Sequence, residues 1–340
     1  MLNKISRKYS NPKRTRSFYI DPFARKEEKR VMTVCLAAIC EKSLIFGASD
    51  RMLTSGDIEF EVANPQSEPS KIIALTSSVV AMIAGDAGLQ REILRELKNV
   101  INERIKKQPN NWWRVKDVAA LYADFYDAAK LRYAKHSILA PFGLDENSFF
   151  QRQKEMSEGF IEKISQSLNR FEMPAVETIV TGIDNDGGPH IYVIHGNYIR
   201  CADPVGFAAI GSGSRHAEAQ FMLAGHEPSA ESPATLFLTY LAKKRAEIAP
   251  GVGKFTDMIG IGPQLGFNAA IKRDIIARLD EICKVHLENE KAAAEKSKQS
   301  ATQYARELGE EAATAATASE SSPNPNPPQT NVSAEGTKPA

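Results

Sequence analysis

Residues 32–39 read Met32-Thr33-Val34-Cys35-Leu36-Ala37-Ala38-Ile39 and form the first apolar run of the chain. The run favours a β-strand, because it is short, nearly continuous in apolar side chains and rich in β-branched residues. A threonine in such a strand ordinarily packs against its neighbours. Polar residues farther along the chain suggest a second role for Thr33, in which its hydroxyl acts as a nucleophile.

The composition is typical of a globular chain long enough for one large domain or two ordinary ones. Hydrophobic residues make up 42% of the 340 residues and charged residues 25%. The net charge of +1 is uneven, because residues 1–31 carry ten Lys/Arg and three Asp/Glu, which leaves the remainder near −6. That balance predicts no nucleic acid partner for the body of the chain.

Four cysteines are spread along the sequence: Cys35, Cys40, Cys201 and Cys283. They form no CxxC pair and have no histidine at metal-ligand spacing, so we expect no metal and no cofactor. The few cysteines and the absence of a secretory apolar segment predict a cytoplasmic protein. No apolar run reaches about 18 residues, so no membrane contact is expected.

The two ends of the chain differ in composition from its middle. Residues 1–32 lack apolar periodicity, which predicts a basic leader, a propeptide or a wrongly assigned start, with a nucleic-acid-binding arm as the alternative. Residues 288–340 begin Ala/Glu/Lys-rich and end Pro/Asn-rich, which predicts a helix running into a disordered tail. The expected globular domain is therefore 33–287.

Within the domain, the periodicity predicts blocks of strands that alternate with pairs of helices. Strands are expected at 33–39, 43–48, 71–75, 79–84, 177–183, 190–194, 207–210 and 255–261, with a polar loop at 54–70. Helices are expected from 88, from 115, within 145–172, after Gly213, after Ser232-Pro233 and from about 268. This order favours layers of antiparallel sheet and helix over a βαβ fold.

Asp50, Lys71, Gly85 and Ser212 are the polar or glycine positions that bear on Thr33. Each has an ordinary interpretation when taken alone. An Asp-Arg pair at a strand end is typical of a turn or an ion pair, and a lysine that opens a strand usually keeps its ammonium in water. Their order along the chain carries the chemical hypothesis.

That order resembles the proteasome β-subunit family of N-terminal-nucleophile (Ntn) hydrolases over about residues 32–262. In that family a strand opens with the catalytic threonine, an Ala-Asp-x-Arg-like segment and a glycine follow, a lysine opens the third strand and Ala-Gly ends the fourth. The matching positions are Thr33, Asp50-Arg51 with Gly56, Lys71-Ile72-Ile73 and Ala84-Gly85. An ungapped alignment puts Ser49 in the place of Asp50.

The second half is similar to the same family. Val180-Thr181-Gly182-Ile183-Asp184 with Gly188-Pro189-His190-Ile191-Tyr192 resembles its hydrophobic-Gly-x-Asp and Gly-Pro-x-hydrophobic-Tyr hairpin, and Phe207–Ser214 resembles its Gly-Ser-Gly segment. The Met-Thr-x-Cys opening resembles the bacterial Anbu-type branch. Two departures stand out: residues 137–174 look like an insertion, and Gly251 stands where the family has a serine.

The resemblance implies an α+β fold, a four-layer αββα sandwich with two antiparallel sheets between helix layers. It also implies the catalytic roles. Thr33 is the nucleophile and its α-amine, with an ordinary pKa near 8, is the base. Asp50 and Lys71 position and polarise the hydroxyl, the Gly85 N–H holds the oxyanion, and Ser212 supports the amine. The expected reaction is hydrolysis of a peptide bond through an acyl-enzyme, with no metal and no cofactor.

This chemistry requires Thr33 to be the first residue of the mature chain. We expect either translation from Met32 with removal of the methionine, or autolysis of a propeptide. The alternatives are a catalytically silent structural or assembly subunit, a hydrolase of a small amide, and Cys35 as nucleophile after a cut at Val34. The expected partners are a peptide or unfolded protein substrate, a homo-oligomeric ring and an unfoldase of unknown identity.

Overall fold

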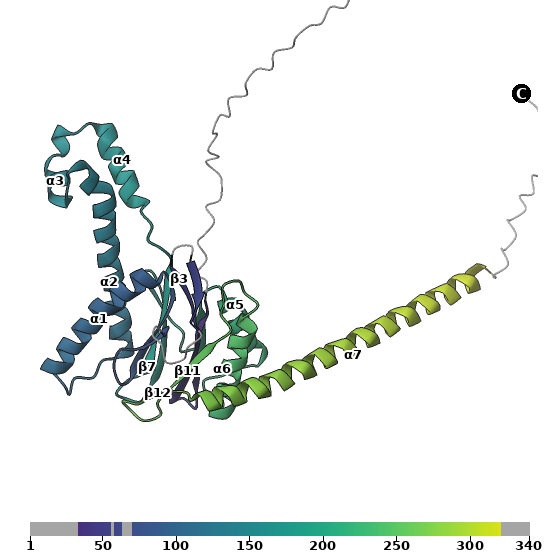
Figure 1. Cartoon of the computed structure of the whole chain (residues 1–340). Helices are drawn as coiled ribbons and strands as arrows, with labels where there is room; N and C mark the ends of the chain where they lie inside the picture. The colour runs from purple at the N-terminus through teal and green to yellow at the C-terminus, as the bar shows by residue number, and fades with distance from the viewer. Residues whose placement is uncertain (1–32, 56–57, 63–69, 321–340) are drawn as a thin grey trace, which may run out of the picture. The chain divides into compact units, whose positions relative to one another are not determined.

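The computed structural model describes residues 33–55, 58–62 and 70–320 (Figure 1). The predicted leader at 1–32, Gly56 and the last part of the predicted tail, 321–340, lie outside these residues. The chain divides into two compact units, 1–276 and 277–340. The first contains every described strand, so the candidate site is built entirely within it.

The predicted first hairpin is confirmed as the centre of a five-stranded antiparallel sheet in the order β10-β1-β2-β11-β12. β1 (Cys35–Cys40) pairs with β2 (Leu44–Asp50), with Cys35 opposite Ser49. Their side chains are almost all buried, as the continuous apolar runs predict. The remaining strands of this sheet are β10 (Phe207–Ile210), β11 (Thr256–Ile261) and β12 (Asn268–Ala270).

The second five-stranded sheet is also antiparallel and follows the chain order β5-β6-β7-β8-β9. Its strands are β5 (Ile72–Ala74), β6 (Val79–Gly85), β7 (Val176–Ile183), β8 (Pro189–His195) and β9 (Tyr198–Cys201). Consecutive strands are neighbours, although the helices between β6 and β7 separate them by ninety residues of sequence. The protein is therefore α+β, with antiparallel sheets as predicted.

One apolar cluster joins the two sheets. It contains Cys35, Ala37 and Ile39 from β1 together with Met82 from β6 and Ile179 from β7. A second cluster packs the other face of the second sheet against α1 (Ala87–Lys107) and α2 (Val115–Ala134). Helices α5 (Ser214–Leu223) and α6 (Ser232–Ala246) contact the strands of the first sheet. In Figure 1 the two helix pairs lie on opposite sides of the strands.

Two predictions are wrong: one loop contains a hairpin, and one helix begins later than expected. The polar stretch expected as a loop contains a short hairpin, β3 (Met52–Ser55) with β4 (Ile58–Glu61). Ile58, Phe60 and Val62 alternate with glutamates, which is a strand pattern, but each strand is only four residues long and the neighbouring glycine and prolines favour a loop. The helix expected near residue 268 starts at Arg273, because 268–270 pair with β11 as β12 instead.

Residues 137–174, the predicted insertion, build a small core of their own from Leu139, Leu144, Phe149 and Ile164. The single helix expected within 145–172 is divided into α3 (Glu146–Gln151), a 3-10 turn η3 (Gln153–Glu155) and α4 (Glu158–Asn169). Before them, α2 continues as a π-helical turn η1 (Lys135–Leu139) and a 3-10 turn η2 (Ala140–Phe142). The division follows the non-helical backbone at Met156 and Ser157.

The last helix, α7 (Arg273–Glu320), continues into the second unit. It covers the start of the predicted Ala/Glu/Lys-rich tail and is rich in charged side chains. Among the described residues, no helix combines the length and the apolar character needed to cross a membrane.

We expect Ile179→Ala to lower the free energy of unfolding by about 2–5 kcal/mol, because its side chain is fully buried between the sheets and its loss leaves a cavity. Urea denaturation followed by circular dichroism measures the change. Val100→Ala, on an exposed part of α1, is the control and is expected to change it by less than about 0.5 kcal/mol. Equal losses for the two variants would contradict the assignment of this shared core.

Candidate active site

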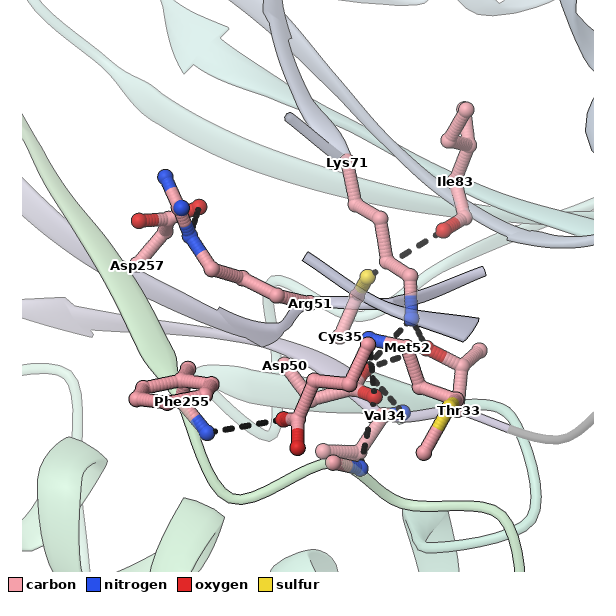
Figure 2. A network of polar contacts seen from close by, with 12 residues as sticks. Thr33, Val34, Cys35, Asp50, Arg51, Met52, Lys71, Ile83, Phe255 and Asp257 are labelled. Carbon is pink, nitrogen blue, oxygen red and sulfur yellow. Dashed lines mark hydrogen bonds and ion pairs between the residues drawn. The ribbon is translucent and has the colours of Figure 1, made fainter. Parts of the chain in front are cut away.

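Four of the predicted site residues come together although they lie far apart in the sequence. Figure 2 shows three of them, Thr33, Asp50 and Lys71. Thr33 lies just before β1 and Asp50 ends β2, so the hairpin brings both to the same end of the first sheet. Lys71 immediately precedes β5 in the opposite sheet. Ser212 lies in the turn between β10 and α5.

The Thr33 hydroxyl lies between a carboxylate and an ammonium. It donates a hydrogen bond to Asp50 Oδ1 and accepts one from Lys71 Nζ. Lys71 also forms an ion pair with the same carboxylate oxygen at 2.6 Å. All three residues are at most 5% exposed. A hydroxyl held in this way has its proton directed to an acceptor and its oxygen beside a positive charge, which is the environment of an activated nucleophile.

The Asp50 carboxylate is held by main-chain donors as well. The Val34 N–H bonds Oδ1 at 3.0 Å, and Oδ2 accepts from the N–H groups of Met52 at 3.1 Å and Gly253 at 2.9 Å. These donors come from three separate parts of the chain. Because a buried carboxylate is stable only when hydrogen bonds replace its water, they fix both oxygens in position.

The geometry resolves the choice between Ser49 and Asp50. Asp50 accepts the hydrogen bond from Thr33, whereas the fully buried Ser49 hydroxyl has no hydrogen-bond partner among the residues that the structure describes. Adjacent strand residues point to opposite faces of a sheet, so only one of the two can face Thr33. Asp50, and not Ser49, is therefore the residue of β2 that contacts the Thr33 hydroxyl.

The backbone of Thr33 is held by the turn that contains Ser212. The Thr33 N–H donates to Ser212 Oγ at 3.3 Å, and Ser212 Oγ bonds the Pro250 carbonyl at 3.0 Å. The Gly213 N–H donates to the Thr33 carbonyl at 3.2 Å. Gly211 has a φ of +88°, and a Cβ there would lie 2.3 Å from the same carbonyl oxygen, so only glycine fits. The predicted contact between Ser212 and the Thr33 nitrogen is therefore present.

The segment 249–253 supplies backbone groups to the site. Gly251 stands where the resembled family has a serine, and its φ of +76° belongs to the left-handed region that favours glycine. The Pro250 carbonyl and the Gly253 N–H point to Ser212 and Asp50 instead. This segment thus contacts the site through its main chain.

Gly85 ends β6, where it pairs with Val176 of β7. Cys35 Sγ donates to the Ile83 carbonyl at 3.3 Å, which joins the end of β6 to the start of β1. Gly85 has a φ of +102°, and a Cβ would lie 2.2 Å from the Ala175 carbonyl oxygen. Glycine is therefore required for the backbone. The oxyanion role of its N–H stays a prediction.

Cys35 is poorly suited to act as a nucleophile. Its thiol is fully buried, and burial raises its pKa well above the ordinary value. A protonated thiol attacks carbonyl groups weakly, because the thiolate is the reactive form. Its contact with Ile83 instead makes it a packing residue between the sheets.

Glu177 on β7 also supports the site, which the sequence analysis did not predict. Its Oε2 accepts from the Gly211 N–H at 2.6 Å, and its Oε1 lies 3.4 Å from His195 Nδ1. Burial acts to raise the pKa of Glu177, but the hydrogen bonds from His195 and Gly211 outweigh it, so the pKa is lowered. A glutamate within a strand carries no sequence signal for such a contact.

In the part of the chain that the structure describes, no group of three or more His, Cys, Asp or Glu side chains is arranged to hold a metal ion. The charged groups at Thr33 are instead one carboxylate and one ammonium, joined by the hydroxyl. The site is therefore arranged for proton transfer and for stabilising charge on oxygen.

We expect Asp50→Asn to lower the free energy of unfolding by about 3–5 kcal/mol, because Lys71 would be left buried without its counter-charge. Ser49→Ala removes an unpartnered hydroxyl and is expected to change it by less than about 1 kcal/mol. Urea denaturation measures both. A larger loss for Ser49→Ala would contradict the assignment of Asp50 as the anchor.

The Glu177–His195 pair gives a pH-dependent stability. The hydrogen bond to Glu177 raises the pKa of His195, so its contribution is complete below the unfolded value of about 6.5 and is lost as pH rises through the folded value. We expect His195→Asn to destabilise the protein at about pH 6 and to have little effect well above the raised pKa. Urea titrations across this range test it. His216→Asn, exposed on α5, is the control, and the same pH trend in both variants would rule the pair out as its source.

Comparison with known proteins assigns no family to this chain. No protein-family model matches the chain, and no curated protein matches its sequence. What the site does is therefore inferred from its contacts, and membership of the resembled family stays a prediction.

Proposed function

We propose that this chain is a threonine-type peptidase of the Ntn-hydrolase kind, similar to proteasome β-subunits, which hydrolyses peptide bonds through an acyl-enzyme on Thr33. The observation that carries the proposal is the buried contact of the Thr33 hydroxyl with both Asp50 and Lys71. A strand threonine needs no such pair for packing, and buried charges are costly without a role.

The proposal includes the four-layer αββα sandwich. Its support is the apolar cluster shared by the two antiparallel sheets, together with α1 and α2 against the second sheet and α5 and α6 against the first. In this arrangement Thr33 and Lys71 come from opposite sheets, so the reacting hydroxyl lies at the end of the space between them.

The proposed reaction starts when the Met32–Thr33 bond is absent and Thr33 carries a free α-amine. The amine accepts the Oγ1 proton while the oxygen attacks the substrate carbonyl carbon. The resulting oxyanion is bound by the Gly85 N–H, and the Lys71 ammonium stabilises negative charge at Oγ1. The C–N bond then breaks as the leaving amine takes the proton, which leaves an ester on Thr33. Water, deprotonated by the same α-amine, hydrolyses this ester and restores the enzyme.

Ser212 is well placed for the amine, because its hydroxyl already accepts from the Thr33 nitrogen. Cleavage would leave that nitrogen where it is and change only its bonding. Translation from Met32 followed by methionine removal, or autolysis of residues 1–32, would each generate it. The Thr33 hydroxyl, which donates to Asp50 in the uncut chain, would then turn its proton toward the new amine.

A catalytically silent structural or assembly subunit is the second candidate function. One observation favours it: Thr33, as an internal residue, already has partners for its N–H, its carbonyl and its hydroxyl. The uncut chain is therefore a stable arrangement in its own right. A small-amide hydrolase would use the same Thr33 chemistry and differ only in its substrate.

The remaining parts of the proposal concern partners and location. The substrate is a peptide or an unfolded protein segment, and the subunits assemble as a homo-oligomeric ring in the cytoplasm. These follow from the resemblance to proteasome β-subunits and from the cysteine-poor sequence. An unfoldase that feeds the ring belongs to the same proposal, and the sequence does not identify it.

We expect intact-mass analysis of the purified protein to find a chain that begins at Thr33. A peptide epoxyketone, which reacts with a hydroxyl and a neighbouring amine, should then label Thr33. Thr33→Ala should abolish labelling and Thr33→Ser should retain it, because serine keeps the hydroxyl nucleophile. Peptide mapping by mass spectrometry measures the site and the extent.

Thr181→Ala is the matched control, since Thr181 is an equally buried strand threonine of the second sheet. It should leave labelling unchanged. An intact bond before Thr33 with no labelling would reject the peptidase and favour the silent subunit. Equal labelling of the Thr33→Ala variant would place the nucleophile elsewhere.

A further inference from the structure

Lys243 is a buried ammonium that the proposed reaction does not use. It lies on α6 with 0% of its side chain exposed and forms an ion pair with Glu247 at 2.6 Å. Its Nζ also donates to the carbonyls of Gly253 and Lys254, both at 2.9 Å. Burial lowers the pKa of Lys243, and Glu247 opposes this effect. All three donors of this ammonium are therefore occupied by named acceptors.

Its neighbour in sequence has a different environment. Lys244 also pairs with Glu247, at 2.8 Å, but its side chain is 22% exposed. Basic residues in the last turn of a helix are commonly solvated and interact with its negative end. That general effect accounts for Lys244. It does not account for the two loop carbonyls that Lys243 holds outside the helix.

The loop at 253–255 is fixed by three charged side chains. Lys243 holds the Gly253 carbonyl, Asp50 accepts the Gly253 N–H at 2.9 Å, and Glu61 Oε1 accepts the Phe255 N–H at 2.9 Å. A Cβ on Gly253 would lie 2.2 Å from Glu61 Oε1 and 3.2 Å from Asp50 Oδ2. The loop therefore lies directly against both carboxylates.

Gly253 connects Lys243 to the candidate active site. Its carbonyl bonds Lys243 and its N–H bonds Asp50 Oδ2, whereas the other Asp50 oxygen faces Thr33 and Lys71. If the loop moved, Oδ2 would lose this donor and would be held by the Met52 N–H alone, so its position relative to Thr33 would be less well fixed. Misplacement of a catalytic group by about 1 Å is enough to reduce a rate by about 100-fold.

We propose that Lys243 is a positioning residue for the nucleophile: it holds the loop at 253–254 so that Gly253 orients Asp50 toward Thr33. This role rests on the proposed function. Lys243 acts through Gly253 and Asp50 and does not touch the reacting atoms. A purely structural role, as an anchor for the end of α6, would leave the reaction at Thr33 unaffected in a folded protein.

The test compares Lys243→Met with Lys244→Met in the full chain. Both remove one ammonium next to Glu247, and each leaves the other lysine to pair with it. The measurement is covalent labelling of Thr33 by the peptide epoxyketone, separated into the binding constant of the probe and the maximal rate constant of labelling. Hydrogen exchange of the segment around Gly253 is measured on the same samples.

We expect Lys243→Met to reduce the maximal rate constant by about tenfold or more and to leave probe binding within about twofold. Exchange at the Gly253 segment should accelerate by about tenfold or more, because its anchor is lost. Lys244→Met should leave both within about twofold of wild type. Lys243→Arg, which keeps the charge and the donors, should recover part of the labelling rate.

Labelling of Lys243→Met at the wild-type rate, or a loss no greater than in Lys244→Met, would overturn the role of Lys243 and leave the proposed function intact. A wild-type chain without labelling at Thr33 would instead reject the proposed function, and this role with it. If Lys243→Met does not fold, the pair Lys243→Met and Glu247→Leu removes both charges together, which buried ion pairs commonly tolerate. That double variant is compared with Glu247→Leu alone on the same criteria.

Discussion

The buried carboxylate of Asp50 is the constraint on which the rest of the site depends. A charge taken out of water must be matched by hydrogen bonds and an opposite charge. Asp50 obtains them from a hydroxyl, an ammonium and three backbone N–H groups. These donors come from the start of β1, the residues around β3 and β5, and the loop before β11. Satisfying one side chain therefore fixes segments from both sheets relative to one another.

This arrangement links stability to the proposed chemistry. Because Thr33 is one of the donors that Asp50 requires, its hydroxyl is oriented before any substrate arrives. Such preorganisation lowers the cost of reaching the transition state, because the oxygen is already held beside Lys71 and only the hydroxyl proton has to turn toward the amine. Glu177 and Lys243 extend the network outward by fixing the turns at Gly211 and Gly253. Glu177 and Lys243 are charged, whereas the turns that they fix contact Thr33 and Asp50 through backbone groups.

The sequence analysis identified most of the residues that meet at the site and missed some of those that hold them. Thr33, Asp50, Lys71 and Ser212 were found because their order matches a known pattern, and their contacts agree with it. Gly85 is placed by its strand. Lys243 carried no signal, because Lys243-Lys244-Arg245 has the composition of a solvated helix end. The divided helices at 146–169 and β12 were missed because they depend on backbone pairing and local packing. The hairpin at 52–61 was missed because its strands are only four residues long and lie among loop-forming residues, although Ile58, Phe60 and Val62 alternate with glutamates.

The sequence by itself determined the apolar strands, the main amphipathic helices and the antiparallel organisation. These follow from local periodicity, because a strand or helix that buries one or both of its faces needs apolar side chains at a regular spacing. Only the tertiary structure decided that Asp50 rather than Ser49 faces Thr33, that backbone groups of Pro250 and Gly253 contact Ser212 and Asp50, and that Lys243 is buried while Lys244 is more exposed. Burial and hydrogen-bond partners depend on segments up to about two hundred residues away, so no local pattern can specify them.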